Sequence, residues 1–216
     1  ELSLMLLIDC SGSNVAGVHS QQKKDLIIEI AAVLAFSATT NNDKVGALFF
    51  SDQPEPFIPP KKGKDHVLYI VRQMLTFEPK SSGTNIANAI RFFNQTLRHK
   101  GIVFLLSDFE TENYDKALKT VSRQHDCIAI RINDRIEYSF PSAGLVPVQD
   151  AETNQVIWLD SSDRQFAAFW KRTYEAQKAA TQSYIQKAGW DYLQFETGQD
   201  YVQTLQSFFM QRIKAR

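Results

Sequence analysis

The sequence predicts an α/β fold: a doubly wound, mostly parallel, Rossmann-like sheet with helices on both faces and an accessory β-hairpin. Two observations lead to this prediction. Short apolar runs alternate along the chain with longer segments of helical periodicity, which is the order of successive βαβ units. The runs are also nearly continuous in apolar residues, which is typical of strands covered on both faces.

The predicted elements follow from this alternation. Strands of the main sheet are expected near residues 2–8, 44–50, 101–106, 127–132 and 192–195. Helices are expected at 23–38, 85–97, 114–124, about 163–188, and 201–213. In the first helix, Lys23, Lys24 and Glu29 are expected to lie away from the apolar stripe, which consists of Leu26, Ile27, Ile30, Val33 and Leu34.

Two segments depart from the βαβ rhythm. The proline-rich run at 53–64 cannot be a central strand, so it is expected to be an edge strand or a loop. Residues 144–160 contain two short alternating runs around a polar centre and are expected to form a hairpin on the edge of the main sheet. Because no repeat or low-complexity linker divides the chain, a single domain over 1–216 is expected. Without an initiator methionine, the chain is expected to be a fragment of a longer protein.

Composition limits the function. Lysine plus arginine equals aspartate plus glutamate at 24 each in 216 residues, and this balance argues against a nucleic-acid or anionic-membrane surface. No apolar run approaches the roughly 18 residues that a membrane span needs. Cys10 and Cys127 lie in or beside apolar strands and are expected to be free thiols of a reduced, cytoplasmic protein.

Several catalytic and cofactor motifs are absent. Gly12 and Gly17 have the spacing of a phosphate-binding P-loop, but Val18 and His19 replace its lysine and hydroxyl residue. No strand is followed by the glycine pattern of a dinucleotide site, and no nucleophile elbow occurs. The four histidines are scattered without the spacing of zinc ligands.

Hydroxyl and carboxylate residues gather instead at predicted strand ends and at one helix start. They are Asp9, Ser11, Ser13, Thr84 and Asp108. In an open α/β sheet all five lie beyond the carboxyl ends of the strands, where ligands bind. Two carboxylates and three hydroxyls are hard oxygen donors suited to Mg²⁺ or Mn²⁺. Each residue also has a local alternative: Thr84 or Asn85 as a helix cap, Asp108 as a cap or turn residue, and the serines as turn formers.

These five positions resemble a known site. "DCSGS", "GTN" and "SDFE" resemble the metal-ion-dependent adhesion site of von Willebrand factor type A domains, and "NNDKVGALFFSD" resembles the second strand of that family. The segment at 123–162 is similar to the subfamily called domain of unknown function fifty-eight, often associated with MoxR-type AAA+ ATPases. The chain departs from the pattern at Asn14, where methionine often stands, and it lacks the upstream segment of fuller members.

The resemblance implies a metal-dependent protein-binding module rather than an enzyme. Mg²⁺, or Mn²⁺ or Ca²⁺, would be held by the five matched residues and would bind an acidic residue of a protein partner. The resemblance implies that the chain works with a MoxR-type AAA+ ATPase in chaperone-like assembly or maturation of other proteins. A metal-dependent hydrolase or phosphatase, which would need a general base that the sequence does not reveal, and a purely structural domain remain alternatives. Asp134 and Glu137 are expected to have ordinary loop roles.

Overall fold

The computed structural model describes residues 2–11, 18–81, 83–134, 137–139, 144–149 and 156–215. The chain forms two compact units, one of residues 1–133 with 184–216 and the other of residues 134–183. The first unit contains the main sheet, and the second contains a hairpin. Because two compact units can belong to one domain, the single domain over 1–216 stays a prediction.

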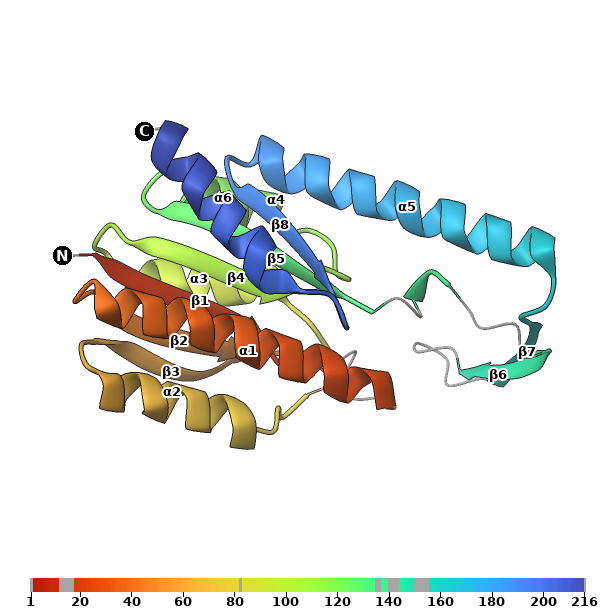
Figure 1. Cartoon of the computed structure of the whole chain (residues 1–216), viewed down its shortest axis with the longest axis horizontal. Coiled ribbons are helices and arrows are strands. Elements are labelled where there is room, and N and C mark those ends of the chain that lie inside the picture. The colour runs from red at the N-terminus through yellow and green to blue at the C-terminus, as the bar shows by residue number, and fades with distance from the viewer. Residues whose placement is uncertain are drawn as a thin grey trace. The chain divides into compact units, whose positions relative to one another are not determined.

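The main sheet has six strands in the order β3-β2-β1-β4-β5-β8 (Figure 1). Their bounds are β1 Ser3–Asp9, β2 Lys44–Phe50, β3 Pro54–Lys61, β4 Ile102–Ser107, β5 Asp126–Asn133 and β8 Asp191–Glu196. Every neighbouring pair is parallel except β2 with β3. β1 lies between β2 and β4, with Leu6 opposite Ala47 on one side and Phe104 on the other. This confirms the predicted fold class and the central position of the first strand.

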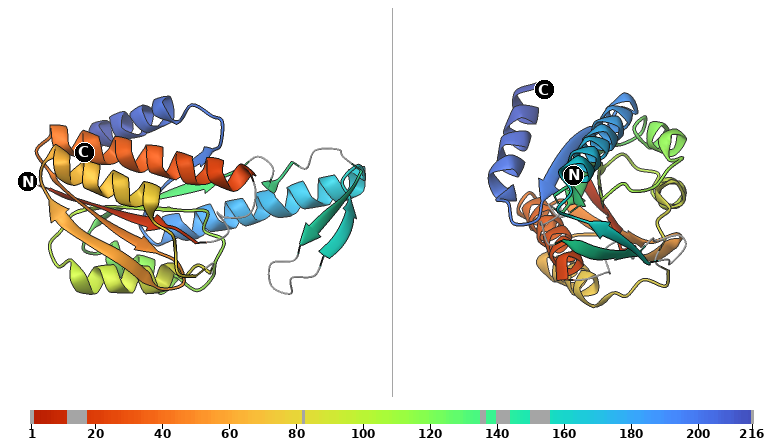
Figure 2. Two further views of the ribbon diagram at one scale, coloured as in Figure 1. Left: turned by 90° about the horizontal axis from the view of Figure 1, so that it is seen from below. Right: turned by 90° about the vertical axis from the view of Figure 1, so that its right-hand side faces the viewer.

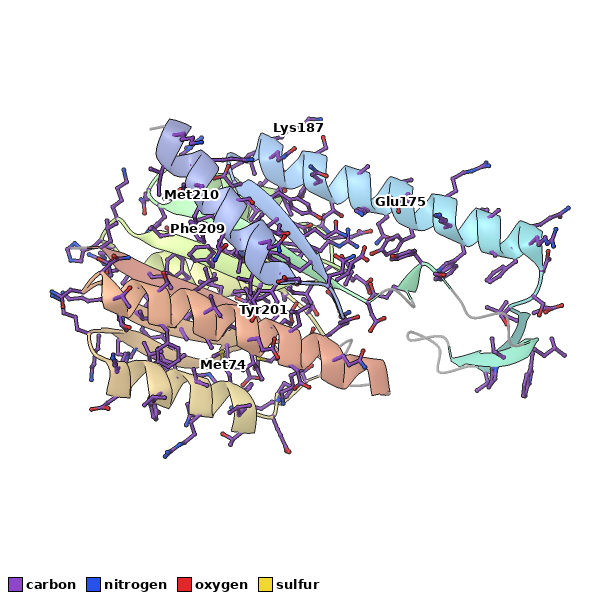
Figure 3. All side chains as sticks on the ribbon, in the orientation of Figure 1. Met74, Glu175, Lys187, Tyr201, Phe209 and Met210 are labelled. Carbon is purple, nitrogen blue, oxygen red and sulfur yellow. The ribbon has the colours of Figure 1, made fainter. Side chains whose placement is uncertain are left out.

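Helices cover both faces of this sheet (Figure 2). On one face, α1 (Val18–Thr40), α2 (Lys64–Thr76) and α6 (Tyr201–Ala215) contribute to one hydrophobic cluster with alternate β1 residues such as Leu6. On the other, α3 (Ile86–Thr96) and α4 (Asp115–Val121) form a second cluster with the intervening β1 residues, such as Leu7. The face of α6 is partly aromatic: Phe209 meets Phe104 edge-on, with ring centroids 6.2 Å apart (Figure 3). The continuous apolar runs of the sequence are therefore explained by burial on both faces.

The burial of α1 differs from the prediction at two positions. Lys23 is buried, with 4% of its surface exposed, although it was expected to lie away from the apolar stripe. Val33 is 44% exposed, although it was expected within the stripe. The buried face runs through Ile27, Ile30 and Leu34, and Lys23 extends it by one turn toward the start of the helix.

Helix α2 is absent from the sequence-based prediction. Its buried residues Val67, Ile70 and Met74 follow helical spacing, and this is the signal that could have revealed it. Exposed Leu68, Tyr69 and Leu75 obscure the pattern, because they place apolar side chains on the solvent face as well.

Strand β3 is the predicted edge strand. It pairs antiparallel with β2 alone, and its register shifts between Val45 and Ala47 and again between Leu48 and Phe50. Its prolines have no N–H to donate, which is tolerated at an edge and not at the centre of a sheet.

The second unit contains β6 (Leu145–Gln149) and β7 (Val156–Asp160), paired antiparallel. The predicted hairpin is therefore confirmed, but its expected place on the edge of the main sheet is wrong, because β6 and β7 form a separate two-stranded sheet. The Ser161 amide and hydroxyl both donate to the Gly144 carbonyl, each at 2.8 Å, and close the base of the hairpin. Residues 150–155, which join the strands, lie outside the described residues. The long helix α5 (Arg164–Lys187) follows.

Within the described residues, every helix is too short or too polar to span a membrane.

Candidate functional site

The strand order reverses between β1 and β4. From β1 the chain builds β2 and β3 on one side, and it then returns to place β4, β5 and β8 on the other. The carboxyl ends of β1 and β4 therefore flank the switch point, where open α/β sheets bind ligands. Asp9 is the last residue of β1, and Asp108 directly follows the last residue of β4. The structure thus brings both predicted carboxylates to this point.

Asp9 is held by hydrogen bonds to both carboxylate oxygens. Oδ1 accepts from the Ser11 amide at 3.0 Å, and Oδ2 accepts from the Ser107 hydroxyl at 2.5 Å. Asp9 and Ser11 are both buried. The bond from Ser11 is a local turn that the Asp-x-Ser spacing permits. Ser107 was not predicted to take part, although it directly precedes Asp108 at the end of a strand.

Asp108 has a cationic partner. Its Oδ1 accepts from the Glu110 amide at 3.1 Å, and its Oδ2 lies 3.3 Å from Nζ of Lys23. Lys23 comes from the second turn of α1, 85 positions earlier in the chain. Sequence reasoning missed this residue because a lysine in an amphipathic helix usually lies on the solvent face.

The two carboxylates interact electrostatically. Burial and then the negative charge of Asp108 raise the pKa of Asp9 from 3.8 to about 6. Hydrogen bonds from Ser107 and Ser11 lower it and oppose these effects only in part. A buried pair of like charges favours either a proton or a cation between its members. Asp9 thus lies in an electrostatic environment that disfavours its ionised form.

Thr84 lies in the segment that leads into α3. The amide of the next residue, Asn85, donates to the Ser51 carbonyl at 2.9 Å, directly after β2. The Thr111 hydroxyl, from the segment after β4, donates to the Thr84 carbonyl at 3.1 Å. The backbone of Thr84 is thus tied to the carboxyl edge of the sheet from two sides. The side chain of Asn85 caps α3 by accepting from the Asn88 amide, so Asn85 rather than Thr84 serves as the cap.

A buried carboxylate anchors the same segment. Oε1 of Glu55 accepts from the Ser51 hydroxyl at 3.0 Å and from the Lys80 amide at 3.2 Å. These bonds connect β3, the end of β2 and the residues before α3. Sequence reasoning missed Glu55 and Ser51, because a glutamate within a proline-rich edge strand carries no motif.

Three further residues of the sequence analysis are Ser13, Asp134 and Glu137. Ser13 lies outside the described residues. The amide of Glu137 donates to the Asp134 carbonyl at 3.1 Å, and the Glu137 carbonyl accepts from the indole of Trp170 at 2.6 Å. These backbone contacts within the second unit are consistent with the ordinary loop roles expected of Asp134 and Glu137.

The donor set fits a hard divalent cation. Asp9 and Asp108 supply carboxylate oxygens, and Ser11 and Thr84 add hydroxyl-bearing residues at the same edge. Across the part of the chain that the structure describes, no three His, Cys, Asp or Glu side chains gather as a metal cluster. The carboxylate and hydroxyl oxygens named above are hard donors, which suit Mg²⁺ or Mn²⁺ better than a soft metal.

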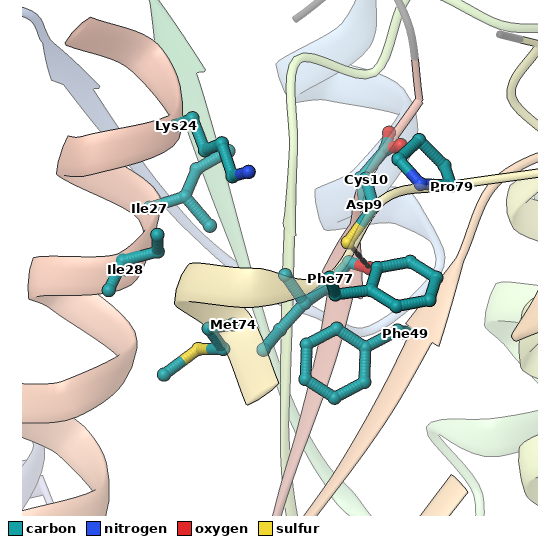
Figure 4. Close-up of a pocket in the computed structure, with 10 residues that line it drawn as sticks. Asp9, Cys10, Lys24, Ile27, Ile28, Phe49, Met74, Phe77 and Pro79 are labelled. Atoms are coloured by element: carbon teal, nitrogen blue, oxygen red, sulfur yellow. Dashed lines mark hydrogen bonds between the residues drawn. The ribbon is translucent and has the colours of Figure 1, made fainter. Parts of the chain in front are cut away.

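The cavity that the described residues form beside Asp9 is small. A cavity of about 50 Å³ lies beside Asp9 and Cys10, between α1 and the end of α2 (Figure 4). Its other lining residues are mainly apolar and include Ile27, Phe49 and Met74. Drug-sized ligands occupy pockets of roughly 300 Å³ or more. This cavity is too small for such a ligand.

Two solved structures resemble the fold. An aerotolerance-related membrane protein from Bacteroides fragilis is 17% identical with a TM-score of 0.66, and the match covers 100% of both chains. The conserved hypothetical protein BatB from Bacteroides thetaiotaomicron is 14% identical with a TM-score of 0.63, covering 100% of this chain and 98% of that one. At these identities the similarity concerns the fold alone.

Sequence comparison identifies the family. An uncharacterized protein of Mycobacterium tuberculosis is 26% identical over 215 residues, which are 98% of this chain and 68% of that protein. The family model described as "Protein of unknown function DUF58" matches residues 1–180. This match spans most of the chain and includes every predicted site residue. The chain therefore belongs to the DUF58 family.

Proposed function

We propose that this chain is a protein-binding module that uses a divalent cation to bind an acidic side chain of its partner. One observation carries the proposal: Asp9 and Asp108 are two buried carboxylates at the switch point of the sheet, where burial and then the charge of Asp108 raise the pKa of Asp9. Burying two like charges costs free energy that a cation between them offsets. Mg²⁺ is the expected ion, with Mn²⁺ or Ca²⁺ as substitutes.

The residues of the chain have distinct roles in this proposal. Asp9, Ser11, Ser13, Thr84 and Asp108 hold the ion, and Ser107 orients Asp9 through its 2.5 Å hydrogen bond. With only two carboxylates among the ligands, the bound ion keeps enough positive charge to attract a further carboxylate. Glu55 and Ser51 keep the Thr84 segment in place through the contacts described above.

The positions of the histidines favour binding over catalysis. The three whose side chains are described lie at the amino edge of the sheet, opposite the site. His66 contacts the Val45 carbonyl near the start of β2, while His99 and His125 precede β4 and β5. None of these three is placed to act as a general base at Asp9, so we do not propose a hydrolase or phosphatase.

The partner class follows from the family resemblance of the sequence. We propose that the chain works in the cytoplasm with a MoxR-type AAA+ ATPase in the assembly or maturation of other proteins. The resemblance of residues 123–162 to the subfamily associated with such ATPases supports this partner, and binding is expected to depend on the cation.

The test is capture of partners with and without the cation. The immobilised chain is incubated with lysate in Mg²⁺ or in chelator, and bound proteins are compared for wild type, Asp9→Asn and Asp43→Asn. Asp43 is a matched control, because it lies at the opposite edge of the sheet, where it accepts from the Leu2 amide. The proposal is supported if wild type and Asp43→Asn retain partners in Mg²⁺. The same partners must be lost in chelator, and Asp9→Asn must fail to retain them. Binding indifferent to both changes contradicts it.

A further inference from the structure

Lys23 is a buried cation inside the candidate site. Its Nζ lies 3.3 Å from Oδ2 of Asp108, and the side chains of the two residues are 5% and 1% exposed. Surface ion pairs are common and contribute little, but a lysine is rarely buried to this degree unless it is paired. The contact is therefore a part of the site and not an incidental surface pair.

The position of Lys23 in α1 explains how it reaches Asp108. Ile27, Ile30 and Leu34 form the buried stripe of the helix, and Lys23 lies one turn before Ile27 on the same face. The stripe covers the apolar middle of the sheet, and at Lys23 it reaches the polar carboxyl edge. Lys24, the next residue, is partly exposed and lines the small cavity beside Cys10 (Figure 4). Of these two lysines, the helix thus directs only Lys23 to Asp108.

The charge of Lys23 opposes a divalent ion. Asp9 and Asp108 together carry two negative charges when ionised, and the ammonium of Lys23 balances one of them. A divalent ion held by Asp108 would repel this ammonium, because Nζ lies 3.3 Å from Oδ2 in a buried place where screening by solvent is weak. Both cations also use the carboxylate of the same residue.

We propose that Lys23 sets the affinity of the site for divalent cations by competing with them for Asp108. This inference rests on the proposed function, because it concerns the same cation. Lys23 keeps the carboxylate of Asp108 paired when no ion is bound, and it weakens binding of the ion when one arrives. Lys23 thereby lowers the affinity for the cation and stabilises the site when no cation is bound.

The experiment measures Mg²⁺ and Mn²⁺ binding by calorimetry on chelator-treated protein. Lys23→Gln removes the charge, and Lys23→Met is a second neutral variant that keeps an unbranched stem. Lys23→Arg keeps the charge, while Lys64→Gln removes an exposed charge at the first residue of α2. The neutral variants at position 23 should bind the ions at least about tenfold more tightly than wild type. Lys23→Arg and Lys64→Gln should bind like wild type.

Thermal unfolding gives an independent readout. In chelator, Lys23→Gln should melt below wild type, because Asp108 loses the buried ammonium that lies 3.3 Å from its Oδ2. With saturating Mg²⁺ its melting temperature should rise by more than that of wild type. A purely structural role would lower the melting temperature without enlarging the rise with Mg²⁺.

The outcomes separate this inference from the proposed function. Equal affinities of wild type and the neutral variants, or weaker binding by the neutral variants, overturn the role of Lys23 and leave the cation site standing. Tighter binding by Lys23→Arg also overturns it. Binding by the neutral variants alone supports it. Absence of binding by every variant overturns both the inference and the proposed function.

Discussion

The Ser107 hydroxyl donates a 2.5 Å hydrogen bond to Oδ2 of Asp9 and joins the ends of β4 and β1 across 98 positions of sequence. The same hydroxyl accepts from the Phe109 amide at 3.0 Å. Phe109 has a φ of 59°, an uncommon left-handed conformation for a phenylalanine. One serine thus fixes both the orientation of Asp9 and the turn that contains Asp108.

Ser107→Ala should destabilise the chain. It leaves the Phe109 amide and Oδ2 of Asp9 without their buried partner, a loss expected to cost about 1–3 kcal/mol of unfolding free energy. Urea unfolding at neutral pH measures this cost. Ser37, which is exposed on α1, provides the control, and Ser37→Ala should be nearly neutral. Equal stability of Ser107→Ala and wild type would contradict the role assigned to the hydrogen bond.

The stability of the cation-free chain should depend on pH through Asp9. The pKa of Asp9 is about 6 in the folded chain and 3.8 in the reference state, so between these values the folded chain holds more protons than the unfolded one. The contribution of Asp9 to the unfolding free energy therefore falls as the pH rises from 3.8 to about 6. Unfolding in chelator across this range should show that fall for wild type. Asp9→Asn should lack it, and an unchanged slope in Asp9→Asn would assign the effect to another group.

Divalent cations should stabilise the chain. At a hundred times its dissociation constant, an ion that binds only the folded state adds about 2.7 kcal/mol. For a chain of this size this is a melting shift of several degrees, at about 2–4 °C per kcal/mol. Asp9→Asn and Asp108→Asn should abolish the shift, and Ser11→Ala should reduce it, since water can replace a neutral ligand. A wild-type melting curve that Mg²⁺ and Mn²⁺ leave unmoved would refute the site.

Gly46 allows β1, β2 and β3 to approach closely. A Cβ at this position would lie 2.6 Å from Sδ of Met5, 2.8 Å from the Ile58 carbonyl oxygen and 2.9 Å from the Pro60 nitrogen. Two of these atoms belong to the backbone, so Gly46→Ala should cost about 1–3 kcal/mol. Gly83 is the matched control, because a Cβ there comes no nearer than 3.5 Å to its neighbours. Chemical unfolding of both variants should therefore show a loss for Gly46→Ala alone.

The two cysteines should be free and slow to react. Burial, and then the charge of Asp9, raise the pKa of Cys10 to about 12, and burial raises the pKa of Cys127. Because the thiolate is the reactive form, alkylation of the native chain at mildly alkaline pH should be slow. Both thiols should react in denaturant without any reductant, as expected for the free cysteines of the structure. A denatured chain with no reactive thiol would contradict this.

The sequence reveals most of the fold because burial dictates its pattern. β1, β2, β4 and β5 are covered on both faces, so they appear in the sequence as short, nearly continuous apolar runs. Helix α2 is not predicted, because exposed Leu68 and Leu75 obscure the helical spacing of its apolar residues. The hairpin was recognised from local alternation, but its separation from the main sheet depends on tertiary contacts, which alternation does not encode.

Some residues of the candidate site could be predicted from the sequence and others could not. Asp9 and Asp108 are predictable from the sequence because each stands at the end of a recognisable strand, and strand order brings those ends together. Lys23, Ser107 and Glu55 were missed because their roles depend on distant partners. A lysine in an amphipathic helix and a serine at a strand end have common local explanations, and only the folded chain shows Lys23 at Asp108 and Ser107 at Asp9.

The prolines of β3 limit how the sheet can associate. Four of its eight residues are prolines, so this edge has few N–H groups to offer an incoming strand. Addition of a strand from another chain needs a row of such donors, and proteins that lack them at an edge resist sheet-to-sheet aggregation. The β3 edge is thus protected against uncontrolled polymerisation. A partner that recognises this protein by strand pairing must use a different edge.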